Sequence, residues 1–450
     1  MIASILAAVR TAGAAAMLTA APGLQAGGVP SAQAEPAQAR AVASDTIPQV
    51  TLAEALDAAA QVDPDYVQAL RQVGDAAWVR RGAWSAFVLP SINFQWSWSK
   101  FDPESFNIGT NQLADRLSQF GISASYDLFR GGAKFHELSQ ASAAIDGAEA
   151  GEVAVRYQTA LETEAAYYDV LAQGQLRGVA AERVRRAREQ LEIARARVLS
   201  GAAVQTDSLQ LLLELTRAEV ELLRQGSALK VARLELGRRV GRVGPVDAAP
   251  LDPAPLPPLP LSQEAAVDEA LDRSPSLLVA RSRQRFTDAV FKAERASYLP
   301  TITLFGQWSG FDDDLIPDAT KRTTVGVQLS YPLFDGADRE LRVFRASTDR
   351  LVADAAAADA ERTTIRDVTE AYEAYTTARA STELAERGVL VGTENLRVQA
   401  ERYRAGETTI IDLITAQVDL AQAEAGLVQA RQATRLALAG VEAILGRRLF

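Results

Sequence analysis

The chain has 450 residues and a formal net charge of -10 at pH 7, an acidic balance that argues against nucleic acid as a partner. It contains no Cys and one His, which excludes disulfides, thiolate catalysis and Cys-ligated zinc and gives no basis for a His-based metal site or a Ser-His triad. We therefore expect no cofactor, no bound metal and no enzymatic activity.

Residues 1–34 are predicted to be a signal peptide. Arg10 is their only charged side chain, small apolar residues follow it, and the segment ends in SAQA, which has the A-x-A pattern of a cleavage site. An earlier cut after LQA at 24–26 and an uncleaved disordered tail are the alternatives. Cleavage makes the mature chain an exported protein that begins with an N-terminal extended segment at 35–50. No later run of about 18 apolar residues occurs, so no transmembrane helix is expected.

The first half of the mature chain changes its hydrophobic period twice. In residues 91–100 apolar side chains (Ile92, Phe94, Trp96 and Trp98) alternate with Ser, Asn or Gln, and such alternation predicts a strand. No Pro occurs from Ala133 to Ser200, and Leu recurs every seven residues from Leu215 to Leu236, which predicts long helices packed as in a coiled coil. The first structural repeat, 51–242, is predicted as a helix, strands at 91–101 and 120–130, a long helix at 133–200 and a helix at 206–239.

A Pro-rich segment at 243–263 is predicted to be an extended linker, and the chain after it repeats the first half. LPSINFQWSWSKF at 89–101 parallels LPTITLFGQWSGF at 299–311, and RVLSGAAVQTDSLQ at 197–210 parallels RYRAGETTIIDLIT at 402–415. These nearly constant offsets indicate an internal duplication. The second repeat, 264–450, is predicted as a helix, strands at 301–311 and 323–334, a long helix at 337–405 and a helix at 408–446.

The four predicted strands are too few for a closed barrel. Closed membrane barrels need about eight strands, and an open sheet in lipid leaves unpaired backbone groups at its edges. Two chains would contribute eight strands, and side chains would fill the interior of so narrow a barrel. Three chains would contribute about twelve strands and leave a channel. The predicted fold is therefore mixed: an all-α coiled-coil tunnel, and four β-strands per protomer pooled into a trimeric, 12-stranded membrane β-barrel.

The alternating strands also predict which side chains face lipid. Aromatic and aliphatic side chains share one face, and Trp is typical of the interfaces between membrane and water. The predicted lipid-facing residues are Phe94, Trp96, Trp98 and Leu329. Gln95 and Gln328 are then expected to face the lumen.

The arrangement resembles the TolC-like family of outer-membrane efflux and export ducts. The resemblance rests on Leu-Pro before the first strand of each half, on DLF at 127–129 and PLF at 332–334, and on a Gly turn with a downstream Asp in each half. It implies a homotrimer in outer-membrane lipid with its helical part in the periplasm. It also implies a passive exit duct of a tripartite efflux or type I secretion system, opened by a periplasmic adaptor and an inner-membrane pump of the RND or ABC type.

The two Gly turns are the candidate functional site. In the resembled family the turns meet the adaptor, and a Tyr before the Gly and an Asp after it help to close the periplasmic aperture. The resemblance therefore implies that the turns at Gly201 and Gly406 dock the adaptor. The implied gate residues are Asp412, Tyr403, Thr206, Asp207 and Thr408.

This chain departs from the family pattern at two positions. Thr408 stands where a closing Arg is expected, and Thr415 stands where a second Asp is expected. A looser closing network, or one that uses Arg402 or Arg404, follows from these departures. The simpler interpretation is that the Thr and Asp residues only cap helix N-termini.

Two questions stay open on the sequence alone. The rival function is a periplasmic coiled-coil scaffold without a pore. Among ducts, the sequence is compatible with drug efflux, metal efflux and polypeptide secretion. FDDDLIPD at 311–318 could bind a divalent cation through carboxylate oxygens, but a solvated loop is the favoured interpretation.

Overall fold

The computed structural model describes residues 47–107, 111–251, 256–312 and 320–449. The predicted signal peptide, most of the predicted N-terminal extended segment and most of FDDDLIPD lie outside these residues. The short strand β1 (Gln49–Val50) pairs in parallel with β4 (Asp247–Ala248), which lies inside the Pro-rich linker. The linker therefore contributes a strand to the first half of the chain.

Each half begins with two helices where the sequence predicted one. The four helices are α2 (Leu52–Val62), α3 (Pro64–Val88), α6 (Gln263–Arg273) and α7 (Pro275–Arg295). The break has a local cause, because Pro64 and Pro275 cannot continue a helix but suit the first turn of the next one. The Asp63 carboxylate caps α3 by accepting hydrogen bonds from the backbone N–H of Asp65 and Tyr66.

Four antiparallel strands form one sheet in the order β2-β3-β5-β6. They are β2 (Ser91–Asn107), β3 (Gln112–Arg130), β5 (Thr301–Asp312) and β6 (Thr320–Ser330). The first hairpin is longer than predicted, because β2 continues beyond residue 101 and β3 begins before residue 120. Strand β6 ends at Ser330, earlier than predicted, and Pro332 just beyond it has no backbone N–H to donate to a neighbour.

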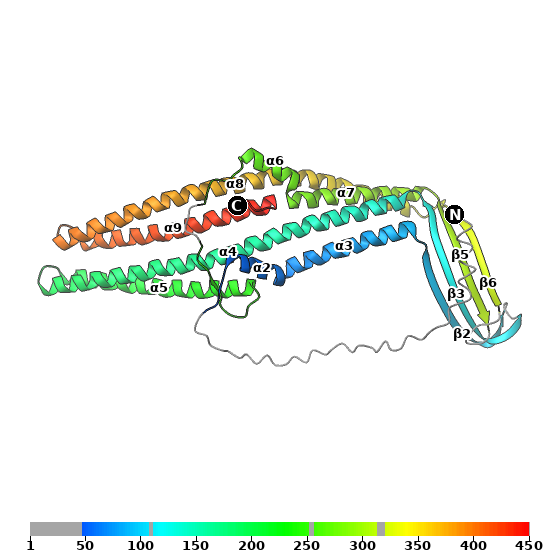
Figure 1. Cartoon of the computed structure of the whole chain (residues 1–450), viewed down its shortest axis with the longest axis horizontal. Coiled ribbons are helices and arrows are strands. Elements are labelled where there is room, and N and C mark those ends of the chain that lie inside the picture. Colours follow the sequence, from blue (N-terminus) through cyan, green and yellow to red (C-terminus); the bar gives the residue numbers. More distant parts are fainter. Residues whose placement is uncertain (1–46, 108–110, 252–255, 313–319, 450) are drawn as a thin grey trace. The chain divides into compact units, whose positions relative to one another are not determined.

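The remaining chain forms two pairs of long helices (Figure 1). They are α4 (Ala133–Leu199), α5 (Gln205–Arg239), α8 (Asp338–Ala405) and α9 (Ile410–Leu445). Helices α4 and α8 contain 67 and 68 residues, so each is about 100 Å long at the helical rise of about 1.5 Å per residue. Leu229 and Leu236 of the predicted heptad are buried, and so are Leu413, Leu420 and Val441 of α9.

The helices lie side by side in the same order as the strands. Next to the sheet the order is α3-α4-α7-α8, and farther away α5 and α9 take the places of α3 and α7. In each half a Tyr of the long helix is buried against the linker: the hydroxyls of Tyr167 and Tyr375 donate to the backbone carbonyls of Ala249 and Pro257. The linker is thus fixed to both halves.

Candidate functional site

The α4–α5 and α8–α9 turns have the same backbone geometry. Gly201 and Gly406 adopt φ angles of 77° and 80°, a left-handed conformation that favours Gly. In each turn the Gly N–H donates to the carbonyl three residues before it, that of Val198 or Tyr403, and the next N–H donates to the carbonyl of an Arg, Arg197 or Arg402. This is the Schellman pattern of helix termination, and it lets each long helix reverse within a few residues.

Asp412 is exposed in the first turn of α9 and closes a capping box with Thr409. Its Oδ2 accepts hydrogen bonds from the Thr409 backbone N–H at 3.1 Å and from the hydroxyls of Thr409 and Thr408 at 2.7 and 2.8 Å. Hydrogen bonds from the Thr409 and Thr408 side chains hold the pKa of Asp412 below its ordinary value. Asp412 therefore carries a negative charge at the tip of the turn and also caps the helix.

Tyr403 is buried, with only 3% of its surface exposed, in a core formed by the ends of the four long helices. Leu191, Leu211, Ile410 and Leu413 belong to the same core. Burial, and next the charge of Asp207, raise the pKa of Tyr403. Among the described residues its hydroxyl has no hydrogen-bond partner. The side chain thus packs inside the protomer, near Asp207 of the α4–α5 turn.

Arg197 joins the two turns, and the sequence analysis did not select it. Its guanidinium donates a hydrogen bond to the backbone carbonyl of Tyr403 and another, at 3.4 Å, to that of Ala202. Its Cζ also lies 4.8 Å from the centre of the Tyr403 ring. The sequence contained a signal for this contact, because an Arg precedes the Gly of each turn by four residues.

Arg402 and Arg404, which the sequence analysis suggested for the closing network, are placed differently from Arg197. Arg402 contacts its own turn, where its guanidinium donates a hydrogen bond to the backbone carbonyl of Glu407 at 3.4 Å. Arg404 is exposed on α8. Thr206 is exposed and Asp207 half-buried in the first turn of α5. Of the five predicted gate residues, the structure brings Tyr403 and Asp207 together and places Asp412 with Thr408.

The predicted lipid-facing residues lie on one face of the sheet. Trp96 pairs with Phe120 and Phe94 with Ile122, and Leu329 occupies the same face of β6. All four predicted residues are exposed in the single chain, Phe94 by 70% and Leu329 by 66% of their surface. Gln95 and Gln328 alternate with them, so they lie on the other face.

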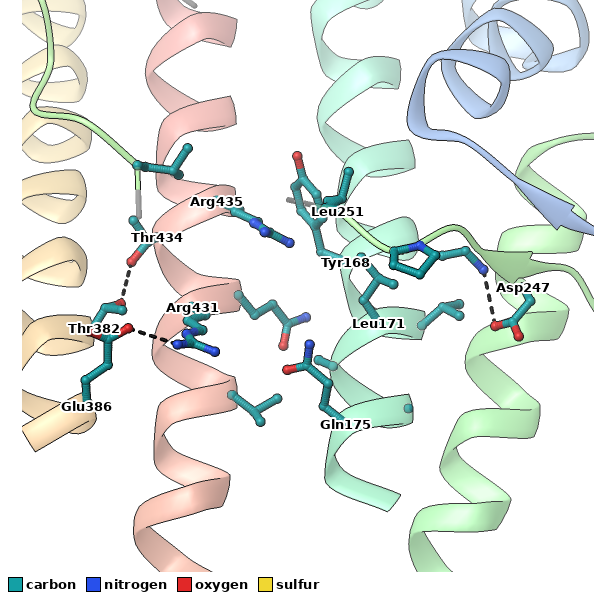
Figure 2. Close-up of a pocket in the computed structure, with 18 of the residues that line it drawn as sticks. Tyr168, Leu171, Gln175, Asp247, Leu251, Thr382, Glu386, Arg431, Thr434 and Arg435 are labelled. Atoms are coloured by element: carbon teal, nitrogen blue, oxygen red, sulfur yellow. Dashed lines mark hydrogen bonds and ion pairs between the residues drawn. The ribbon is translucent and has the colours of Figure 1, made fainter. Parts of the chain in front are cut away.

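One charged pocket lies in the middle of the helices, away from the turns. This cavity of about 460 Å³ is bounded by α4, α8, α9 and the linker, and Figure 2 shows Tyr168, Gln175 and Arg431 around it. Its charges are paired, since Arg431 lies 2.9 Å from Glu386 and Arg233 lies 2.7 Å from Asp247. Its electrostatics are therefore those of a packed interface between helices.

The part of the chain that the structure describes has neither a membrane-spanning helix nor a cluster of metal-binding side chains. In residues 47–107, 111–251, 256–312 and 320–449, no helix is both long and apolar enough to cross a membrane. The same residues contain no group of three or more His, Asp or Glu side chains that could hold a metal ion.

Comparisons with known proteins agree with this geometry. A family model described as "Outer membrane efflux protein" matches residues 31–242 and 266–447. Protein CyaE of Bordetella pertussis is 27% identical over 419 residues, which cover 90% of this chain and 86% of CyaE. Outer membrane protein TolC of Vibrio cholerae is 24% identical over 397 residues, or 84% of this chain and 87% of TolC.

Solved structures show the same fold. The CmeC outer membrane channel of Campylobacter jejuni superposes with a TM-score of 0.76 at 16% identity and covers 88% of this chain and 85% of CmeC. The family model and these likenesses confirm the resemblance drawn from the sequence.

Proposed function

Because this chain belongs to the outer membrane efflux protein family, we propose that three copies of it assemble into a passive exit duct. Proteins of this family are channels of the outer membrane for efflux or secretion rather than enzymes, and their helical part lies in the periplasm. Membership also implies partnership with a periplasmic adaptor and an inner-membrane pump. The proposal adds the trimer, its contact with outer-membrane lipid and the opening of the duct by the docked partners.

The trimer is supported by the unpaired edges of the sheet. Strands β2 and β6 are the two edges of a four-stranded sheet, and in lipid their free backbone groups need partners. Pairing β6 of one copy with β2 of the next closes twelve strands from three copies, which is wide enough for a channel. The two unpaired edge strands are the observation that carries the proposal.

The helical edges support the same assembly. Helices α5 and α8 are the outer members of the row of long helices, and both carry exposed aliphatic side chains. On α5 these include Leu209, Leu213 and Leu223, and on α8 they include Leu384, Leu390 and Val391. Covering such rows with the neighbouring copy would remove apolar surface from water. The matching order of elements in the two halves further supports an internal duplication, in which each half contributes one hairpin and one helical pair.

We place the gate at the two turns. Asp412 supplies an exposed negative charge at the tip of α9, and Arg197 fastens the end of α8 to the end of α4. Three copies would bring three such charges around the tunnel axis. Docking of the adaptor at the turns of Gly201 and Gly406 would separate them and widen the aperture.

Assembly and conduction test the proposal directly. The mature protein, purified in detergent, is expected to have the mass of a trimer by light scattering and to form cation-conducting pores in planar bilayers. A folded monomer that stays dispersed in detergent-free buffer and forms no pores would instead support the periplasmic scaffold. As a control for the edge pairing, a Pro at Phe94 in β2 should prevent trimer formation, because Pro removes a ladder hydrogen bond.

A further inference from the structure

One cation lies on the polar face of the sheet near the hairpin end of β6. Arg322 is the third residue of this strand, its side chain is exposed, and it pairs with Ser309 of β5. Ser309 pairs with Gly121, and Gly121 pairs with Gln95. Because side chains alternate between the two faces of a strand, Arg322 shares the face of Gln95, opposite the face of Phe94 that is predicted to meet lipid.

The rest of this polar face carries few charges. Its residues belong to the paired segments 91–99, 117–130, 301–309 and 322–330. They are mostly Ser, Thr, Asn, Gln and Gly, and three are charged: Asp127, Arg130 and Arg322. Asp127 and Arg130 form an ion pair at 3.7 Å, close to the point where β3 enters α4.

The charge of Arg322 is not compensated within the described sheet. The three residues in register with it, Ser309, Gly121 and Gln95, are uncharged. The nearest acidic residue of this face is Asp127, which is in register with Gln328. Six residues of β6 separate Gln328 from Arg322, which is about 20 Å along the strand. Arg322 therefore gives the hairpin end of this face a local positive charge.

In the trimer of the proposed function, on which this step rests, three copies of Arg322 lie on the wall of one lumen. All four strands join the helices at their other ends, so the Arg322 end of β6 lies towards the outer mouth of the barrel (Figure 1). Twelve strands about 4.8 Å apart and tilted by about 40° enclose a barrel of about 12 Å radius. Since the screening length is about 8 Å at physiological salt, three cations on this wall affect ions across most of the lumen.

We propose that the three copies of Arg322 form a cationic ring that binds small polyanions, such as polyphosphates and tricarboxylates, in the outer mouth of the duct. A polyanion that touches two or three guanidinium groups replaces their mutual repulsion with charge-assisted hydrogen bonds, and each guanidinium can hold two oxygens at once. A monovalent anion meets fewer of these groups. Valence therefore decides affinity at the ring.

The ring is independent of the negative charge at the periplasmic turns. Helix α8 alone is about 100 Å long, so Arg322 and Asp412 are separated by more than about ten screening lengths. Block by multivalent anions at the outer mouth and block by multivalent cations at the turns should therefore be changed by different substitutions.

The chain offers a matched control and a gain-of-charge variant. Lys321 precedes Arg322 and is also exposed, but it pairs with Gly310 on the face that is turned away from the lumen. Lys321→Gln therefore removes the same charge from the adjacent position without changing the ring. Arg322→Lys keeps the charge of the ring, and Gln95→Arg adds a second cation in register with Arg322.

The test is single-channel recording in planar bilayers with inorganic tripolyphosphate on the barrel side. Trimers of the full chain are added to one chamber, so that the large helical part stays there and the barrel opens to the other. Wild type should be blocked in 0.1 M KCl and more weakly in 1 M KCl, where the screening length falls from about 10 Å to about 3 Å. Arg322→Gln should raise the half-blocking concentration roughly tenfold or more. Lys321→Gln should match wild type, Arg322→Lys should retain most of the block, and Gln95→Arg should strengthen it.

Three results would overturn the ring: a half-blocking concentration that is unchanged in Arg322→Gln, an equal rise in Lys321→Gln, or equal block by orthophosphate at matched concentration. The last result would show attraction of anions without a site for polyanions. The acidic segment at 313–318 lies outside the described residues and is the same in every variant, so it cannot cause a difference between them. A chain that forms neither trimers nor pores would overturn the ring and the proposed function together. A conducting trimer whose block ignores Arg322 would overturn the ring alone.

Discussion

Arg197, two residues before the end of α4, donates a hydrogen bond to the backbone carbonyl of Tyr403, two residues before the end of α8, and lies against its ring. The two residues come from different halves of the chain. The contact ties one helix pair to the other at the tip, where the aperture is proposed to open. Any movement that separates the two turns must first break it.

Arg197→Ala should therefore loosen the tip. We expect a higher resting conductance and a loss of about 1–2 kcal/mol of stability, because a charged hydrogen bond and a cation–π contact are removed. Arg197→Lys should give an intermediate conductance, since it keeps the charge but loses the planar guanidinium. Arg195→Ala is the control, because Arg195 forms an ion pair with Glu192 on its own helix. Single-channel recording of the three variants measures the effect. A resting conductance in Arg197→Ala no higher than in Arg195→Ala would show that the contact between Arg197 and Tyr403 does not hold the aperture closed.

Tyr403 should matter through its ring and not through its hydroxyl. The hydroxyl is buried and has no partner among the described residues, so Tyr403→Phe should leave stability and resting conductance close to wild type. Tyr403→Ala should cost about 3–5 kcal/mol, as truncations of buried aromatic side chains do. Thermal unfolding and conductance of both variants measure the difference. A Phe variant that conducts as much at rest as the Ala variant would show that the hydroxyl holds the gate.

Asp412 has two roles that different substitutions separate. Asp412→Asn removes the charge but keeps a side-chain oxygen for the cap, so it should reduce cation selectivity and block by a trivalent cation at the periplasmic side. Thr409→Ala removes the capping partner and keeps the charge, so it should lower thermal stability and leave selectivity unchanged. If Asp412→Asn retains both selectivity and block, the residue is only a helix cap.

The pKa of Asp412 adds a pH dependence to this prediction. Since its folded-state pKa lies below the ordinary value, the ionised carboxylate contributes stability that is present at neutral pH and lost as pH falls through the folded-state pKa. Cation selectivity due to Asp412 should therefore persist at neutral and mildly acidic pH. Selectivity that disappears near neutral pH would point to a different group.

The two faces of the sheet should respond differently to charge. Phe94→Arg or Leu329→Arg should impair assembly in the membrane, because Arg near the bilayer midplane costs about 2–4 kcal/mol on the lipid face of a barrel. Gln95→Arg and Gln328→Arg are the matched controls on the opposite face and should change conductance instead. Heat-modifiable trimer bands and bilayer recording report the two effects. Equal tolerance at all four positions would contradict the assignment of faces.

Arg448 should be the most important cation of the C-terminal segment. It lies 2.6 Å from Glu164 and 2.7 Å from Glu442, two carboxylates that are almost completely buried. Arg448→Met would leave both uncompensated and should cost about 2–3 kcal/mol, less than for a fully buried pair because Arg448 is half-exposed. Arg447→Met is the control, since it breaks a more exposed pair with Glu269 and should cost about 1 kcal/mol or less.

The effect of Arg448→Met should also depend on pH. Burial raises the pKa of Glu164, and Arg448 opposes that shift. Without Arg448 the folded-state pKa rises further above the unfolded value, so stability falls as pH rises through this range. Urea unfolding at a series of pH values should therefore show the largest deficit at neutral pH and a smaller one in mild acid. A deficit that grows on acidification would exclude this explanation.

The sequence by itself determined the elements of this protein, because their signals are local. Period-two alternation located four strands, the absence of Pro from 133–200 located a helix of unusual length, and Gly201 and Gly406 marked the turns. The sequence missed the breaks before Pro64 and Pro275 although Pro is a local signal. It also ended the first strand too early, because a polar stretch can continue a strand once a partner provides its hydrogen bonds.

Only the tertiary structure decided which side chains meet. Tyr403, a predicted gate residue, lies in a core at the tip of the helices, and the cation that reaches it is Arg197 from the other half instead of Arg402 beside it. Lys100 opposite Arg116 follows from strand register, and a shift by one residue would move every side chain to the other face. Such contacts depend on how helices and strands pack over long sequence separations, and a local pattern of residues carries no information about that packing.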